Sequence, residues 1–160
     1  MTEHVEMPKL NLKYSMVLPG KFGGKTCETI EIVDTVCVRY KIQHDHNSMK
    51  ESQGEAHLSE NVASFFLSMV RESALWKEED TSSWPRPDAI SPGEQELQLE
   101  LEGTPRVELK AAFRHSPTPR QDEERLDDGY VNFCMFIKDL REAARLAVSM
   151  HCRDKLLPFA

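Results

Sequence analysis

Residues 10–18 read LNLKYSMVL, with an apolar side chain at every second position. That alternation predicts a half-buried strand. The same period continues through Thr26–Val33 and Val36–Ile42, and we place Val36 on the apolar face of the third strand. The polar pair Asp34-Thr35 between them predicts a two-residue hairpin. The chain therefore opens with a meander of three antiparallel strands.

The rest of the chain alternates between helical and extended patterns. Residues 44–54 are polar, and we expect at most a short edge strand there. Three further elements follow in order: a helix over Glu60–Trp76 with Ser59 as its N-cap, a hairpin of Gln95–Leu101 with Arg106–Phe113, and a long helix over Tyr130–His151. This order predicts an α+β domain over residues 10–160 after a flexible segment 1–9, with an antiparallel sheet covered by helices on one face.

Both predicted helices carry more apolar surface than one sheet needs. A sheet-facing stripe occupies a little over ~100° of a helix, but the apolar residues of each helix spread much further. Met135 and Leu146 lie outside even the wide arc of the second helix. The excess indicates either an interface with another protein, or a thick core or homodimer face.

Composition narrows the functional classes. The net charge of −7 disfavours direct gripping of a phosphate backbone, which requires neutralisation by Lys and Arg. No apolar run reaches the ~18 residues of a transmembrane helix, and no signal peptide is visible. The four cysteines lack metal-site spacing and are expected to be reduced and partly buried, which indicates an intracellular protein. They are Cys27, Cys37, Cys134 and Cys152.

No catalytic or cofactor motif stands out, so we expect neither an enzyme nor a bound cofactor. The stretch GKFGGK at residues 20–25 lacks phosphate-loop spacing and precedes a strand, which favours a plain turn. His44 and His46 have no third ligand nearby and fit a solvated loop better than a metal site. His151 beside Cys152 is proximity in sequence only. The acidic residues 122–124 and 127–128 suit a solvated loop or a contact for a basic partner.

Several motifs, in order, resemble the Mago nashi family over roughly residues 10–159. The most specific is KEED at 77–80 followed by WPRPD at 84–88, similar to the family's KEDD and WPPPD. The remaining matches are Lys13-Tyr14, Gly20-Lys21-Phe22-Gly23, Arg39-Tyr40, Gln95-Glu96-Leu97, Asp139-Leu140, His151 and Pro158.

The resemblance implies a six-stranded antiparallel sheet, with a fourth strand near Met49–Leu58, and two long antiparallel helices packed on one face. It also implies a non-enzymatic, nuclear and shuttling subunit of the exon junction complex. Such a subunit forms a heterodimer, through its helices, with an RNA-recognition-motif protein of the tsunagi type. The pair locks a DEAD-box helicase of the eIF4A class on spliced mRNA. The subunit is therefore associated with mRNA indirectly, through the complex, and no membrane is involved.

The resemblance also yields site expectations. We assign partner binding to seven residues: Ala63, Leu67, Val70, Phe136, Ala143, Ala147 and Met150. Phe65 and Leu67 stand where the family has Glu and Lys, which indicates a shifted footprint or a further partner at Phe65. Ala143 and Ala144 replace larger side chains, so the partner is expected to fill the space. Asp128 is matched to an acidic position near the helicase contact, although the loop before it, residues 116–127, departs from the family.

Three other functions compete with this one. A scaffold of the same fold with a different partner would keep the apolar helix faces. A protein that binds RNA directly would show salt-sensitive RNA affinity as an isolated chain. A ligand or metal protein that uses His44 and His46 would reveal itself by metal content.

Overall fold

The computed structural model describes residues 7–20, 24–45, 50–78, 80–114, 118–121, 123 and 125–156. Some expectations fall outside these residues. They are the turn at Lys21, Phe22 and Gly23, the histidine His46, the strand start at Met49, the motif positions Glu79 and Pro158, the loop positions Ser116, Asp122 and Glu124, and the side chain of Cys152. The expected flexibility of residues 1–9 stays a prediction.

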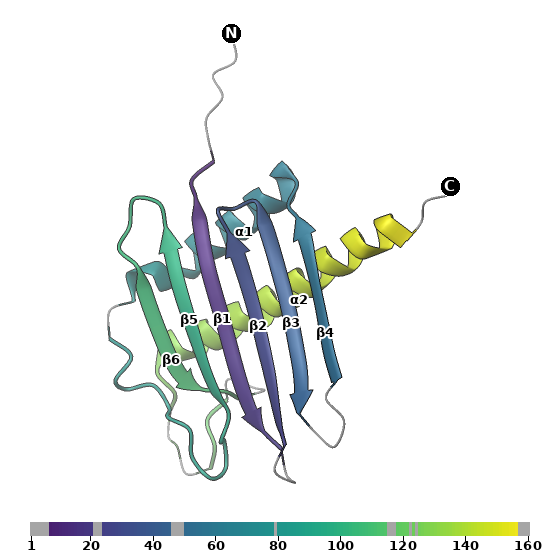
Figure 1. Cartoon of the computed structure of the whole chain (residues 1–160). Coiled ribbons are helices and arrows are strands. Elements are labelled where there is room, and N and C mark those ends of the chain that lie inside the picture. The colour runs from purple at the N-terminus through teal and green to yellow at the C-terminus, as the bar shows by residue number, and fades with distance from the viewer. Residues whose placement is uncertain are drawn as a thin grey trace.

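Six strands form one antiparallel sheet in the order β4-β3-β2-β1-β5-β6 (Figure 1). Their bounds are β1 (Leu10–Pro19), β2 (Lys25–Val33), β3 (Cys37–Asp45), β4 (Lys50–His57), β5 (Glu94–Leu101) and β6 (Val107–Ala112). The predicted meander is therefore present as β1-β2-β3. The later hairpin β5-β6 joins the sheet beside β1, so the first strand becomes a central one.

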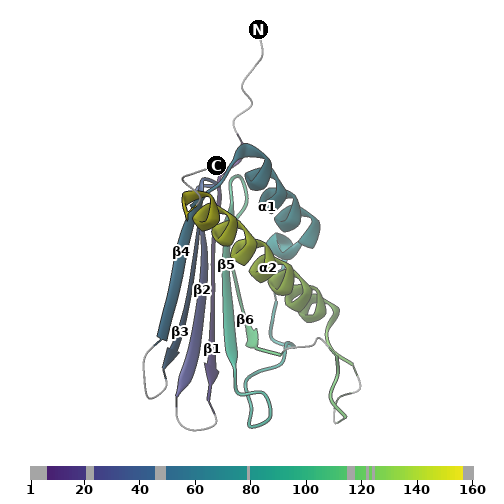
Figure 2. The ribbon, with the colours of Figure 1, turned by 90° about the vertical axis from the view of Figure 1, so that its right-hand side faces the viewer.

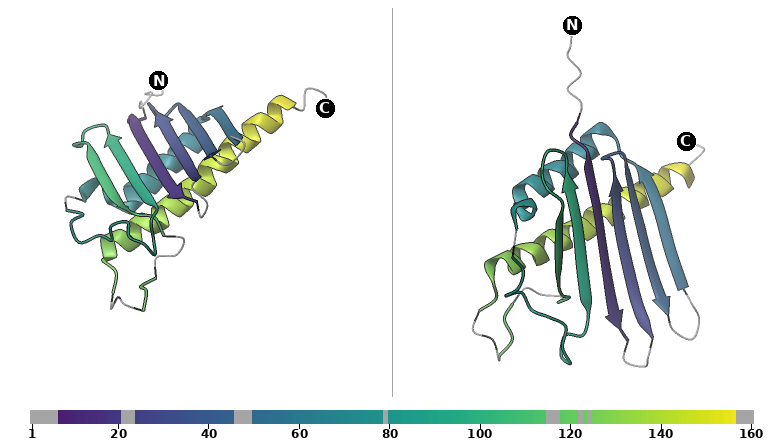
Figure 3. Two further views of the ribbon diagram at one scale, coloured as in Figure 1. Left: turned by 60° about the horizontal axis from the view of Figure 1, so that its bottom comes forward. Right: turned by 60° about the vertical axis from the view of Figure 1, so that its left-hand side comes forward.

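Two helices, α1 (Glu60–Ser73) and α2 (Asp128–Leu156), cover the same face of this sheet and run antiparallel (Figures 1 and 2). Helix α2 crosses the strands obliquely, from beneath β6 to beyond the edge at β4 (Figure 3). The opposite face bears no helix in the part of the chain that the structure describes. This arrangement confirms the α+β fold with six strands and two helices.

The core lies between the sheet and the helices. Strand β1 contributes Leu10, Leu12, Tyr14 and Met16, all buried, which confirms the alternation read from its sequence. The side chains between them, such as Lys13, point to the polar face. From the helix side, Phe66, Phe133 and Leu140 close the core.

The hairpin β2-β3 corrects the predicted placement of Val36. Asp34 and Thr35 both adopt left-handed φ values of 50° and 61°, the backbone of a tight type I′ turn. Val36 N–H donates to Val33 O at 2.9 Å and closes this turn. Val36 therefore belongs to the turn and is exposed, and the apolar face of β3 begins at Val38.

Helix α1 is shorter than predicted. Its N-cap is Ser59 as expected, with Oγ accepting from Val62 N–H at 3.3 Å. It ends at Ser73 because Ala74 takes a left-handed φ of 57° and bends the chain. The 3₁₀ turn η1 (Leu75–Lys77) follows, and this bend turns Leu75 into the core. Helix α2 is longer than predicted at both ends.

Strand β4 is the edge strand expected in this region, but it is longer than the local pattern indicated and lies where the resemblance implied a fourth strand. It pairs with β3 along its whole length, from Lys50 to His57. Gly54, at its centre, faces α2 so closely that a β-carbon there would collide with Val148. A glycine in this strand therefore allows the helix to approach the sheet.

None of the described helices is long and apolar enough to cross a membrane.

An apolar groove between the two helices

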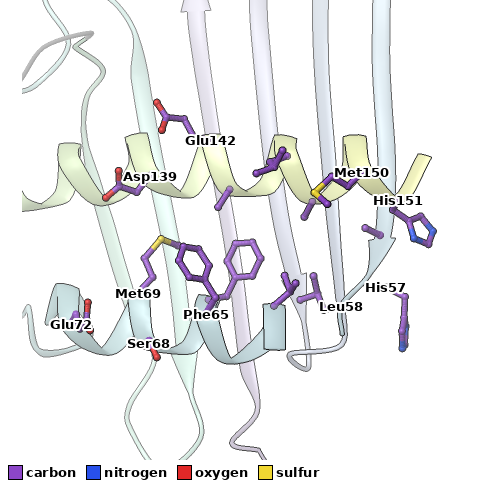
Figure 4. Close-up of a pocket in the computed structure, with 16 residues that line it drawn as sticks. His57, Leu58, Phe65, Ser68, Met69, Glu72, Asp139, Glu142, Met150 and His151 are labelled. Carbon is purple, nitrogen blue, oxygen red and sulfur yellow. The ribbon is translucent and has the colours of Figure 1, made fainter. Parts of the chain in front are cut away.

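A groove of about 740 Å³ runs between α1 and α2 on the side away from the sheet (Figure 4). Its floor is formed by Ala56 and Leu58, at the end of β4, and by Phe66. Helices α1 and α2 supply the two walls. The groove therefore belongs to both helices and depends on their antiparallel packing.

The α1 wall consists of Val62, Phe65 and Met69, which succeed one another at intervals of three and four residues. That spacing places them on one side of the helix. Phe65 is 57% exposed and meets the buried Phe66 ring edge-on, with 6.0 Å between ring centroids. Its ring is oriented toward α2 (Figure 4). Phe65 therefore offers apolar surface that the chain itself leaves uncovered.

The α2 wall combines small and large side chains. Ala143 and Ala147 lie one turn apart and are half-buried, while Leu146 and Met150 are 61% and 57% exposed. The two alanines leave a hollow opposite the α1 wall, and the two larger side chains border it. This wall is therefore a shallow apolar hollow with exposed side chains at its border.

The two ends of the groove differ in charge. Glu72 and Asp139 lie toward the end where α1 finishes, with Glu142 nearer the middle, and His57 and His151 lie at the other end (Figure 4). An occupant with a basic group near Glu72 and Asp139 would be favoured by charge complementarity. The groove is thus apolar along its length and acidic toward one end.

A buried ion pair positions α2 on the sheet. Glu28 of β2 is fully buried and accepts two hydrogen bonds from Arg141, at 2.6 and 2.9 Å. Arg145 adds a third at 3.3 Å and donates from Nε to the Tyr40 hydroxyl at 2.9 Å. The bond to Glu28 raises the pKa of Arg141. Charge-assisted bonds with this geometry fix the rotation of α2 about its axis, and with it the direction of the groove wall.

The start of α2 is fixed by Asp127. Its Oδ1 accepts from Gly129 N–H at 2.8 Å and from Trp84 Nε1 at 3.2 Å, and its Oδ2 accepts from Ser83 Oγ at 2.9 Å. The bond from Ser83 is the main reason why the pKa of Asp127 lies below its usual value. Trp84 itself is buried against Tyr130 and Phe133. The WPRP segment therefore anchors the beginning of α2.

The structure separates the predicted site residues into three groups. Ala63, Leu67, Val70 and Phe136 are buried in the chain's own core. Ala143, Ala147, Met150 and Phe65 line the groove. Asp128 lies apart, at the start of α2, with its carboxylate 83% exposed and paired with Arg125 at 2.9 Å. Partner contact stays a prediction for all of them.

Three apolar residues of the helix walls were not among the predicted contacts: Val62, Met69 and Leu146. The signal for them was present, because each falls on the apolar arc of its helix or just beyond it. What the sequence did not reveal was which part of each wide arc faces the sheet.

The other candidate groups have ordinary partners. His44 lies on β3 with Nδ1 3.1 Å from Thr26 Oγ1. Cys27, Cys37 and Cys134 are free thiols. Among the described residues, no three His, Cys, Asp or Glu side chains come together as a metal site. Glu123 of the acidic loop pairs with Arg114 and Arg120.

Comparison with known proteins agrees with this architecture. No curated protein sequence matches the chain. The family model described as Mago nashi protein matches residues 10–157, which is most of the chain. The matched region includes the whole sheet, both groove-forming helices and nearly all of the described residues. The chain therefore belongs to the Mago nashi family of exon junction complex subunits.

Proposed function

We propose that this chain is a non-enzymatic exon junction complex subunit that binds an RNA-recognition-motif protein of the tsunagi type in the groove between α1 and α2. The heterodimer then helps to lock a DEAD-box helicase on spliced mRNA. The chain acts in the nucleus and shuttles to the cytoplasm, in mRNA processing, export, localisation or decay.

The observation that carries the proposal is the uncovered apolar surface of the groove. Phe65, Leu146 and Met150 expose more than half of their side chains along one continuous hollow. Contiguous apolar patches on soluble proteins typically mark interaction sites. The sequence argument for an interface rested on the same excess. Its alternative of a thick core does not account for these three exposed side chains, and its alternative of a homodimer face predicts recovery of a second copy of the chain in place of another protein.

The chemistry of the groove suits an RNA-recognition-motif sheet. Such a sheet carries aromatic side chains that otherwise stack on bases. Large aromatic or aliphatic side chains would fill the hollow over Ala143 and Ala147. The net charge of −7 supports an arrangement in which RNA is contacted by other subunits.

The burial pattern divides the roles of the proposed residues. Ala143, Ala147, Met150 and Phe65 contact the partner directly in our proposal, together with Leu146. Ala63, Leu67, Val70 and Phe136 support the walls from below, since they are buried in the free chain. The exposed Asp128 is proposed to contact the helicase, in exchange for its present pairing with Arg125.

The proposal is tested by co-purification of tagged variants. Leu146→Glu should reduce recovery of the one-to-one RNA-recognition-motif partner at least tenfold, since it places an unpaired charge in an apolar interface. Ala147→Arg should act in the same way. Ile90→Glu is the matched control, because Ile90 is similarly exposed but lies outside the groove.

Each outcome separates the competing functions. Unchanged recovery with both groove variants would contradict the groove assignment. A different class of partner lost on Leu146→Glu would favour a scaffold of the same fold. Tight, salt-sensitive RNA binding by the isolated chain would favour direct RNA recognition.

A further inference from the structure

The chain contains the tripeptide Thr-Pro-Arg twice, at residues 104–106 and 118–120. Threonine directly before proline is the substrate signature of proline-directed protein kinases. These enzymes bind the acceptor in an extended segment, the conformation that a following proline favours. The two copies lie in different structural surroundings, so their accessibility to such a kinase differs.

Thr104 is held in the tight turn of the β5-β6 hairpin. Its N–H and its hydroxyl both donate to Leu101 O, at 2.9 and 2.8 Å. Gly103 before it has a left-handed φ of 88°, and Arg106 donates to Gln98 at 2.6 Å. A kinase would have to open this hairpin in order to reach the Thr104 hydroxyl.

Thr118 is exposed and lies outside the helices and strands. It lines a hollow of about 540 Å³ together with Arg114 and Arg120. A phosphate placed on Thr118 would therefore enter a region that already contains two guanidinium groups.

The two arginines are engaged by carboxylates. Arg114 is 6% exposed and forms a two-point pair with Glu123, at 2.6 and 2.9 Å. Arg120 pairs with Asp88 at 2.8 Å. The Arg114 guanidinium is the main reason why the pKa of Glu123 falls to about 2. Arg114 Nε is buried and has no hydrogen-bond partner among the described residues, so this group has donor capacity that Glu123 does not use.

We propose that Thr118 is a phosphorylation site for a proline-directed kinase, and that the phosphate competes with Glu123 and Asp88 for Arg114 and Arg120. The Thr118 hydroxyl attacks the γ-phosphorus of ATP. An O–P bond forms to threonine, the bond to the β-phosphate oxygen breaks, and ADP and a proton leave. The doubly charged product forms stronger charge-assisted hydrogen bonds to arginine than a carboxylate does.

The test uses the full chain, a purified cyclin-dependent or mitogen-activated kinase and ATP, with site assignment by mass spectrometry. Thr118 should be phosphorylated at least tenfold faster than Thr104. Thr118→Ala should remove most of the incorporated phosphate, and Thr104→Ala should leave it unchanged. Equal rates at the two threonines, no incorporation, or labelling of Ser116 in place of Thr118 would overturn the assignment.

The arginine contact has its own measurement. The second pKa of phosphothreonine is about 6 in an exposed peptide. A ³¹P NMR titration of the phosphorylated chain should give a value clearly below that, and Arg120→Gln should move it back toward 6. A second pKa equal to that of a Thr-Pro-Arg peptide would overturn the arginine part of the proposal.

Discussion

Phe65 and Phe66 are neighbours in α1, yet Phe66 is 1% exposed and Phe65 57%. The same division recurs in α2, where Val148 is buried against Gly54 and Leu146 projects outward. We call the surface of the helix pair that packs on the sheet the inner side, and the surface that lines the groove the outer side. The two sides are similarly apolar in sequence but differ in what covers them.

The inner side is completed by the chain itself. Its apolar side chains meet the sheet, and its two arginines, Arg141 and Arg145, engage the buried carboxylate of Glu28 on β2. The outer side has apolar side chains without a cover. An uncovered apolar surface does not stabilise the isolated chain, so its presence is explained by a molecule outside it. Substitutions on the two sides should therefore affect different measurements.

The largest expected difference is between Phe66→Ala and Phe65→Ala. Phe66→Ala should lower the free energy of unfolding by about 3–5 kcal/mol, since it leaves a cavity in the core. Phe65→Ala should change it by less than about 0.5 kcal/mol, as at other exposed positions. Urea denaturation followed by circular dichroism measures both.

Phe65, on the outer side, should matter for partner recovery although it does not matter for stability. Phe65→Ala should weaken co-purification while the chain remains folded. Similar losses of stability for the two variants would mean that Phe65 is covered in the isolated protein, and the distinction between the two sides would fail.

The second prediction concerns the buried ion pair between Glu28 and Arg141, which joins the sheet to the inner side of α2. Glu28→Gln should cost about 3 kcal/mol, because it leaves Arg141 partly buried without its counter-charge. Because Arg141 is partly exposed, we expect a loss of stability at the lower end of the range for broken buried ion pairs. Glu31→Gln, on the same strand but the opposite face of the sheet, is the matched control and should be nearly neutral. An equal effect of both substitutions would show that the ion pair does not position α2.

The sequence predicted the parts of the fold whose local pattern and tertiary environment agree. Strand β1 alternates from Leu10 to Met16, and Ser59 is a typical N-cap, so both predictions were correct. Strand β4 was underestimated because its inward positions include Gly54 and Ala56, which are not typical of a strand. Gly54 is required by the close approach of Val148 on α2, a tertiary contact that the local sequence pattern does not reveal.

The positions of the candidate site residues in the fold were predicted less well than the fold itself, for a related reason. A wide apolar arc indicates that a helix has two apolar neighbours, but not which residue faces which neighbour. Leu67 and Val70 were assigned to the partner, although the sheet side buries them. The Glu28–Arg141 pair joins residues 113 positions apart, so only the fold reveals it.

The smallest expected effect comes from adding carbon atoms to each side of the helix pair. Gly54→Ala adds one carbon to the inner side, where it collides with Val148, and should cost about 1–3 kcal/mol. Val148→Ala should reduce that cost when the two changes are combined, with a coupling of at least about 0.5 kcal/mol in a double-mutant cycle.

Ala143→Leu makes the opposite test, since it adds three carbons to the outer side. The groove has room for them, so the free energy of unfolding should change by less than about 0.5 kcal/mol. Partner recovery should nevertheless fall, because the new side chain occupies the hollow in which we propose that the partner binds. If Ala143→Leu instead destabilised the chain as much as Gly54→Ala, the groove would be closed in solution. Stable chains with undiminished partner recovery would mean that the partner binds elsewhere on the helices.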